Sequence, residues 1–197
     1  MPKKTDFHLR VWSVVGFVLA MLIASCSGKY LEDTDHEWKT VTNEQFNFSV
    51  DYPTKWVTQV FDENGYKGDK DTRLIISRPA IFRHDPSTFA IRIESRAMES
   101  PDLQDVIDWS DEYLDWIRAG PTKGYGFEEI LLEEDEINGY PIMRRQYTLS
   151  SNFLKVEEIL IAREQDMIMI TMIVDKEYFT SYHRDFDDIV ASFSPLE

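Results

Sequence analysis

The chain has a single cysteine among 197 residues, and this scarcity excludes a disulfide scaffold and any cysteine-rich zinc site. It is also poor in positive charge. Lys and Arg number 21 against 36 Asp and Glu, and the net charge of −15 repels a phosphate backbone, so we expect no nucleic-acid partner. The content of 43% hydrophobic and 29% charged residues is that of a globular protein. At roughly 100–200 residues per domain, the length predicts one folded domain with appendages.

The common catalytic motifs are missing. There is no G-x-S-x-G, no H-E-x-x-H and no glycine-rich phosphate loop ending in Lys-Ser/Thr. Beyond the N-terminal segment the histidines are His36, His84 and His183, and none has a second histidine at ligand spacing. We therefore predict a protein that is not an enzyme, with no cofactor and no metal site.

The N-terminus has the pattern of an export signal. Lys3, Lys4 and Arg10 precede an apolar run over 11–24, which at about fourteen residues is shorter than the roughly 20 that a membrane-spanning helix needs. The following Leu22-Ile23-Ala24-Ser25-Cys26 resembles a bacterial lipobox, in which the cysteine is diacylated, as by palmitate, and becomes the first mature residue. We predict a lipoprotein signal peptide over 1–25 and lipidation of Cys26. An uncleaved anchor is the alternative.

The polar residues 26–42 show no period and predict a tether, followed by a domain over 43–197. Two acyl chains hold a protein stably on a bilayer, so the predicted location is the bacterial cell envelope. Ser27 after the cysteine is typical of outer-membrane sorting in diderm bacteria, which would face the domain to the periplasm. Otherwise the outer face of the cytoplasmic membrane is expected.

Period-two patterns predict strands on both sides of a helix. Phe46, Phe48, Val50 and Tyr52 alternate with polar residues, and Pro53 ends that strand. Asn138-Gly139 is the strongest short hairpin signal in the chain. The predicted strands lie at 46–52, 56–61, from 74, 89–94, 127–137, 140–150, 156–163 and 167–174.

Period-3.6 patterns predict helices over 100–118 and 176–193. Ser100 is a candidate N-cap of the first, before Pro101, and Asp175 of the second. Gly120-Pro121 is expected to end the first helix. Hairpins and two helices together predict an α+β fold in which helices pack on an antiparallel sheet.

Two segments resemble PsbP-like domains: the opening Phe46-Asn47-Phe48-Ser49-Val50-Asp51-Tyr52-Pro53-Thr54-Lys55-Trp56 and the closing Phe186-Asp187-Asp188-Ile189-Val190-Ala191-Ser192-Phe193. The resemblance implies an antiparallel sheet between helices, an α/β/α sandwich. It also implies a non-catalytic accessory or binding role, since the family includes an extrinsic photosystem II subunit, Ran-binding nuclear-import proteins and envelope lipoproteins. No ion-binding motif of the family matches here residue by residue.

Two groups of residues are candidates for partner binding. Trp109, Tyr113 and Trp116 form an aromatic strip on an acidic helix, although aromatic residues at helical spacing also serve as core. The segment Arg83-His84-Asp85 belongs to a predicted irregular loop, where binding residues concentrate, although a solvated connector is the alternative.

Other polar residues receive structural interpretations. Arg144 and Arg145 should point to opposite faces of their strand, one of them in a buried ion pair, and His183 should be at the surface or half-buried. The acidic run 133–136 is a solvated hairpin end that could attract a divalent cation weakly.

The predicted function is that of a lipid-anchored accessory protein that binds another envelope protein or a small ligand. A carrier enclosing a lipid or other apolar ligand between sheet and helix is the first alternative. A hydrolase using carboxylates such as Glu94 and Asp108 ranks last, because no spacing favours that pair.

Overall fold

The computed structural model describes residues 37–67, 69–78, 90–119, 127–149 and 153–196, without the side chains of 116–119. The chain divides after Thr34, and every described residue belongs to the second unit, Asp35–Glu197. Within the described residues, no helix is both long and apolar enough to cross a membrane.

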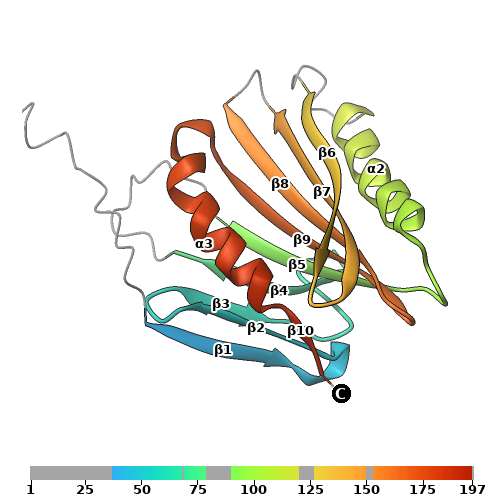
Figure 1. Cartoon of the computed structure of the whole chain (residues 1–197), viewed down its shortest axis with the longest axis vertical. Coiled ribbons are helices and arrows are strands. Elements are labelled where there is room, and N and C mark those ends of the chain that lie inside the picture. The colour runs from blue at the N-terminus through green and yellow to red at the C-terminus, as the bar shows by residue number, and fades with distance from the viewer. Residues whose placement is uncertain (1–36, 68, 79–89, 120–126, 150–152, 197) are drawn as a thin grey trace, which may run out of the picture. The chain divides into compact units, whose positions relative to one another are not determined.

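Two antiparallel sheets form the framework (Figure 1). The larger sheet has the strand order β3 (Val57–Val60), β4 (Thr72–Ser77), β5 (Ala90–Ala97), β9 (Asp166–Asp175), β8 (Leu154–Ala162), β7 (Tyr140–Leu149) and β6 (Glu128–Ile137). The smaller sheet has the order β1 (Trp38–Asn43), β2 (Phe48–Pro53) and β10 (Ser194–Pro195). The helices are α2 (Leu103–Ala119) and α3 (Phe179–Ser192), with short 3₁₀ turns η1 (Glu44–Phe46) and η2 (Lys176–Tyr178).

The central strands of the larger sheet, such as β8 and β9, bury side chains on both faces, since successive side chains of a strand point to opposite sides. On β8, Ile159 faces α3 and the smaller sheet, whereas Leu160 faces α2. The α3 face holds the main core, in which Phe48, Phe186 and Phe193 are buried. Helices on the two sides of an antiparallel sheet (Figure 1) confirm the predicted α+β fold.

The hairpin at Asn138-Gly139 is confirmed and joins β6 to β7. Both residues have positive φ, 50° and 83°, which is the conformation of the two central residues of a type I′ turn. Asn138 also donates from Nδ2 to the carbonyl of Phe193 at 2.7 Å, so the turn is tied to the end of α3.

Three predicted boundaries were wrong. Residues 38–42, assigned to the predicted tether, belong to the folded domain, because Trp38–Asn43 pairs with β2 as strand β1. Phe46 lies in η1 and not in a strand, because Asn47 takes a left-handed conformation with φ 49°. The N-cap of α2 is Asp102 and not Ser100: its carboxylate accepts from the Asp105 N–H at 3.1 Å, and Asp105 accepts from the Asp102 N–H at 2.8 Å.

The last helix also begins later than predicted. Residues 176–178 form the 3₁₀ turn η2, and α3 starts at Phe179. Asp175 makes no side-chain capping hydrogen bond there.

Candidate functional site

The adjacent residues Arg144 and Arg145 anchor two polar clusters on opposite faces of the larger sheet, as their sequence positions predicted. Arg144 faces α3, where it forms ion pairs with Glu157 and, at 2.9 Å, with Asp187. Arg145 faces α2, where it contacts Asp111 at 2.8 Å and Glu129 at 2.9 Å. Both arginines are therefore paired, and both pairs include a residue that lies beyond the neighbouring strand.

The α3-side cluster consists of Arg144, Glu157, His183 and Asp187. His183 lies between the two carboxylates, with Nε2 3.1 Å from Glu157 Oε2 and Nδ1 2.9 Å from Asp187 Oδ2. Glu157 is completely buried on β8, whereas the side chains of His183 and Asp187 are 31% and 41% exposed. The cluster thus has a buried floor and a solvent-accessible rim.

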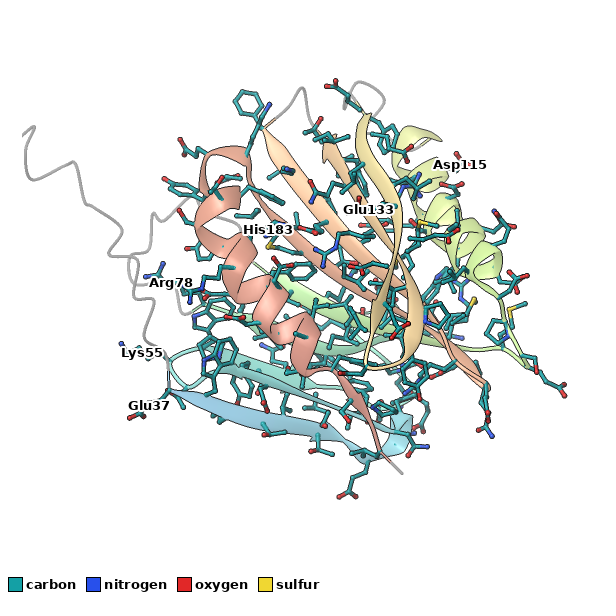
Figure 2. All side chains as sticks on the ribbon, viewed as in Figure 1. Glu37, Lys55, Arg78, Asp115, Glu133 and His183 are labelled. Carbon is teal, nitrogen blue, oxygen red and sulfur yellow. The ribbon has the colours of Figure 1, made fainter. Side chains whose placement is uncertain are left out.

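A groove of about 440 Å³ opens beside this cluster, between α3 and the β6–β7 hairpin. Its polar lining includes Glu133, Asp135, Arg144, His183 and Asp187. Figure 2 labels Glu133 on β6 and His183 on α3, the two elements that border the groove. The arrangement can hold a cation or a hydrogen-bonding ligand at the surface.

The α2-side cluster consists of Ser110, Arg145, Tyr147 and Glu158. Glu158 is fully buried and accepts hydrogen bonds from Ser110 Oγ and from the Tyr147 hydroxyl, each at 2.6 Å. Arg145 in turn donates to Ser110 Oγ at 3.0 Å. Burial raises the pKa of the Glu158 carboxyl, and burial together with Glu158 raises that of Tyr147.

Glu94 on β5 is a second buried carboxyl on this face. Burial raises its pKa to about 8, because removal from water outweighs the attraction of Arg92, whose Nε lies 3.4 Å from Oε2. The nearby carboxylates Asp69 and Glu158 raise the pKa further. The α2 face of the sheet therefore holds two buried carboxyls whose pKa values are raised.

A second groove, of about 620 Å³, lies where the start of α2 meets the β6–β7 hairpin. Leu103, Ile107, Pro141 and Met143 give it an apolar surface, and Glu134 of β6 lies at its border. The two grooves therefore flank the same hairpin on opposite faces of the sheet.

The strand β6 itself is an edge of the larger sheet, and among the described residues only β7 pairs with it. Eight of its ten residues are exposed, including Ile130 at 50% and Leu132 at 45%. The predicted solvated acidic run 133–136 lies on this strand.

The aromatic strip on α2 is partly core. Trp109 is 4% exposed and packs with Met143 and Leu160, so it is not available as a surface anchor. Tyr113 is half-buried, with its ring 5.5 Å from the Arg92 guanidinium. The side chain of Trp116 lies outside the described residues, and partner binding through the strip stays a prediction.

The other predicted binding residues belong to segments that the structure does not describe. Arg83, His84 and Asp85, and the predicted lipidation site Cys26, all lie outside the described residues.

The two carboxylates considered for a hydrolase are Glu94 and Asp108. Glu94 is buried on the α2 face of the sheet, whereas Asp108 is exposed and accepts a hydrogen bond from Gln104 at 2.8 Å. The two do not share an environment.

Sequence reasoning missed the α3-side cluster, although two signals pointed to it. His183 and Asp187 are four residues apart on a helix, so they share one face. Glu157-Glu158 interrupts an otherwise apolar strand, which indicates buried charges in need of partners.

No protein-family model and no curated protein matches the chain. Solved structures do match. The cyanobacterial PsbP (CyanoP) of Synechocystis is 12% identical with a TM-score of 0.63, covering 82% of this chain and 94% of its own. LpqN of Mycobacterium tuberculosis, described as involved in cell envelope biogenesis, is 10% identical with a TM-score of 0.52, covering 87% and 97%. A Bacteroides thetaiotaomicron protein is 11% identical with a TM-score of 0.51, covering 81% of this chain and 48% of its own. These likenesses establish that the chain has a PsbP-like α+β fold.

Proposed function

We propose that this chain is a lipid-anchored accessory protein of the bacterial cell envelope, which performs no chemistry and binds a partner protein along β6. The lipobox-like segment ending at Cys26 supports the anchor. The PsbP-like fold, shared with an envelope-biogenesis protein of M. tuberculosis, supports the envelope setting. The observation that carries the binding role is the outer edge of β6, with which no strand of the described residues pairs.

The backbone of β6 is suited to receive one more strand. Ile137 and Tyr140 flank the two-residue turn, so they form the hydrogen-bonded pair that closes the hairpin. From Ile137 backwards along β6, residues that bond to β7 alternate with residues whose N–H and C=O groups point outward. Leu132, Glu134 and Glu136 therefore direct their N–H and C=O groups away from β7. The Glu136 N–H donates to Asp135 Oδ1 at 2.8 Å, so a partner strand would gain its main-chain hydrogen bonds mainly at Leu132 and Glu134.

The two grooves explain how such a strand would be recognised. Alternate side chains of an added strand point to opposite faces, one set toward the groove beside α3 and the other toward the groove beside α2. The carboxylates of residues 133–136 favour a basic partner segment. They disfavour a second copy of this chain, because two acidic β6 strands would repel each other.

The packing does not favour the carrier alternative. Phe179, Tyr182 and Phe186 of α3 fill the space above the sheet with the main core. The space under α2 holds Glu94 and Glu158, which are poor neighbours for a lipid tail.

Two substitutions of Glu134 distinguish the contribution of its backbone N–H to partner binding from that of its carboxylate. Glu134→Pro removes an outward N–H without breaking a bond to β7, as proline is tolerated on sheet edges. Loss of one hydrogen bond of about 1 kcal/mol should reduce partner capture at least about fivefold. The measurement is crosslinked pulldown of the anchored protein from its native cells, with quantitative mass spectrometry of proteins and lipids.

Glu134→Ala is the matched control, since it removes the same carboxylate and keeps the N–H. It should capture clearly more partner than Glu134→Pro at equal thermal stability. Cys26→Ala should lose the partner by releasing the protein from the membrane. Equal capture by the proline and alanine variants would remove β6 from the proposal, and undiminished capture by Cys26→Ala would remove the anchor.

A further inference from the structure

Glu157, His183 and Asp187 bring three metal-ligating side chains together at the floor of the groove beside α3. One donor atom from each lies within 4.8 Å of the others. His183 and Asp187 are one helical turn apart on α3, and the side chain of Glu157 points from β8 toward them. The residues come from two elements that pack across the main core, so the fold itself fixes their approach.

A buried and unsatisfied oxygen points into this cluster. Glu157 is 0% exposed, and its Oε1 is held by Arg144. Its Oε2 has no hydrogen-bond partner among the described residues, although His183 Nε2 lies 3.1 Å away. A buried carboxylate oxygen without a donor is costly, and a cation at this point would satisfy it.

From this geometry we propose that Glu157, His183 and Asp187 bind one Zn²⁺ ion, with a coordination position open to the groove. An imidazole and two carboxylates are a ligand set suited to Zn²⁺, and three protein ligands leave a fourth position for water or another group. Ligand atoms of a tetrahedral site with bonds of about 2.0 Å lie roughly 3.3 Å apart. The 3.1 Å between His183 Nε2 and Glu157 Oε2 is close to this value, and one donor atom from each of the three residues lies within 4.8 Å of the others.

The charges of the cluster allow a divalent cation. The two carboxylates exceed the one guanidinium of Arg144 by a negative charge, and an imidazole that binds a metal adds none. Binding requires the Asp187 carboxylate, which is 41% exposed, to turn from Nδ1 of the ring toward the metal on the Nε2 side. The imidazole nitrogen gives Zn²⁺ an advantage over Ca²⁺, which takes oxygen ligands. The site does not depend on the β6 proposal.

The test is a titration of Zn²⁺ against a chelating dye with the full chain in detergent. Every variant carries Cys26→Ala, so that no thiol contributes. We expect one Zn²⁺ per chain, with Ca²⁺ in equal concentration unable to displace it. His183→Ala and Asp187→Asn should each weaken binding at least about tenfold, because even the loss of an outer-shell partner costs that much at metal sites.

Asp188→Asn is the matched control. It removes the same charge from the next position of α3, where the side chain is exposed, and should leave Zn²⁺ affinity unchanged. His183 and Asp187 are both partly exposed, so their variants should keep the fold, and circular dichroism melts verify this. Unchanged affinity in both ligand variants, or displacement of Zn²⁺ by Ca²⁺, would overturn the site in favour of nonspecific binding to acidic surface.

Discussion

Raising the pH from about 5 to about 9 should lower the free energy of unfolding by on the order of 4 kcal/mol through one side chain, Glu94. Its carboxyl is buried on the α2 face of β5, and the pKa is raised from 4.5 to about 8. The folded protein therefore holds a proton that the unfolded chain has released. Each pH unit between these two values costs about 1.4 kcal/mol of stability.

The direction is opposite to that of most paired carboxylates. Because the folded state binds the proton more tightly, the stabilising contribution is complete below pH 4.5, falls through the interval, and is lost above about pH 8. The cause is removal from water, which Arg92 at 3.4 Å offsets only in part. Glu158 adds to the trend in the same direction, since burial raises its pKa as well.

Glu94→Gln should remove this slope, because glutamine has the shape of the protonated acid and cannot ionise. Urea unfolding at several pH values between about 5 and 9 measures the difference between the two proteins. Glu99→Gln, which removes a carboxylate from an exposed position near the end of the same strand, should retain the wild-type slope. Parallel curves for wild type and Glu94→Gln would show that Glu94 is ionised in the folded protein.

Much of the sheet could be predicted because its strands carry their own local signals. Alternation of apolar and polar residues predicted β2 and β5, and their burial patterns follow it. The Asn138-Gly139 turn sets the register of β6 on β7. The strand β1 was missed because its residues are mostly exposed, so no apolar face appears in Trp38–Asn43. Its position comes from pairing with β2, which is a long-range property.

The polar clusters could be predicted only in part, since each is assembled across the sheet. Adjacent arginines in one strand must face opposite sides, and so must Glu157 and Glu158 in the next. Which helix covers which face is decided by topology. Only that placement brings His183 to Glu157 and Ser110 to Glu158.

The two faces of the larger sheet hold their helices by different interactions. The α3 face is a packed apolar core that admits polar groups near β7, where the groove opens. The α2 face is polar through its centre, with Arg92, Thr171, Glu158 and Arg145 in register across four neighbouring strands. Such a row holds α2 by directed hydrogen bonds, from Ser110 to Glu158 and from Arg145 to Asp111.

Arg145→Met should destabilise the protein by about 3–5 kcal/mol, the usual cost of removing one partner from a buried charged network. The Arg145 side chain is 6% exposed and holds Asp111 and Glu129 together with the Ser110 hydroxyl. Without the guanidinium, the buried carboxylate of Glu158 loses the nearest positive charge on its own row. Chemical denaturation measures the loss, and the exposed Arg184→Met should change stability by less than about 0.5 kcal/mol.

A second substitution identifies the cause. Glu158→Gln in the Arg145→Met background removes the buried charge while an amide can still bond to Ser110 and Tyr147, so it should recover part of the lost stability. The cost of Arg145→Met alone should also become smaller as the pH is lowered, because burial raises the pKa of Glu158 and a protonated Glu158 needs no counter-charge. If the double variant were as unstable as the sum of the two single variants, the loss would come from packing of the arginine stem. Arg145 would then stabilise the protein through packing and not by neutralising the charge of Glu158.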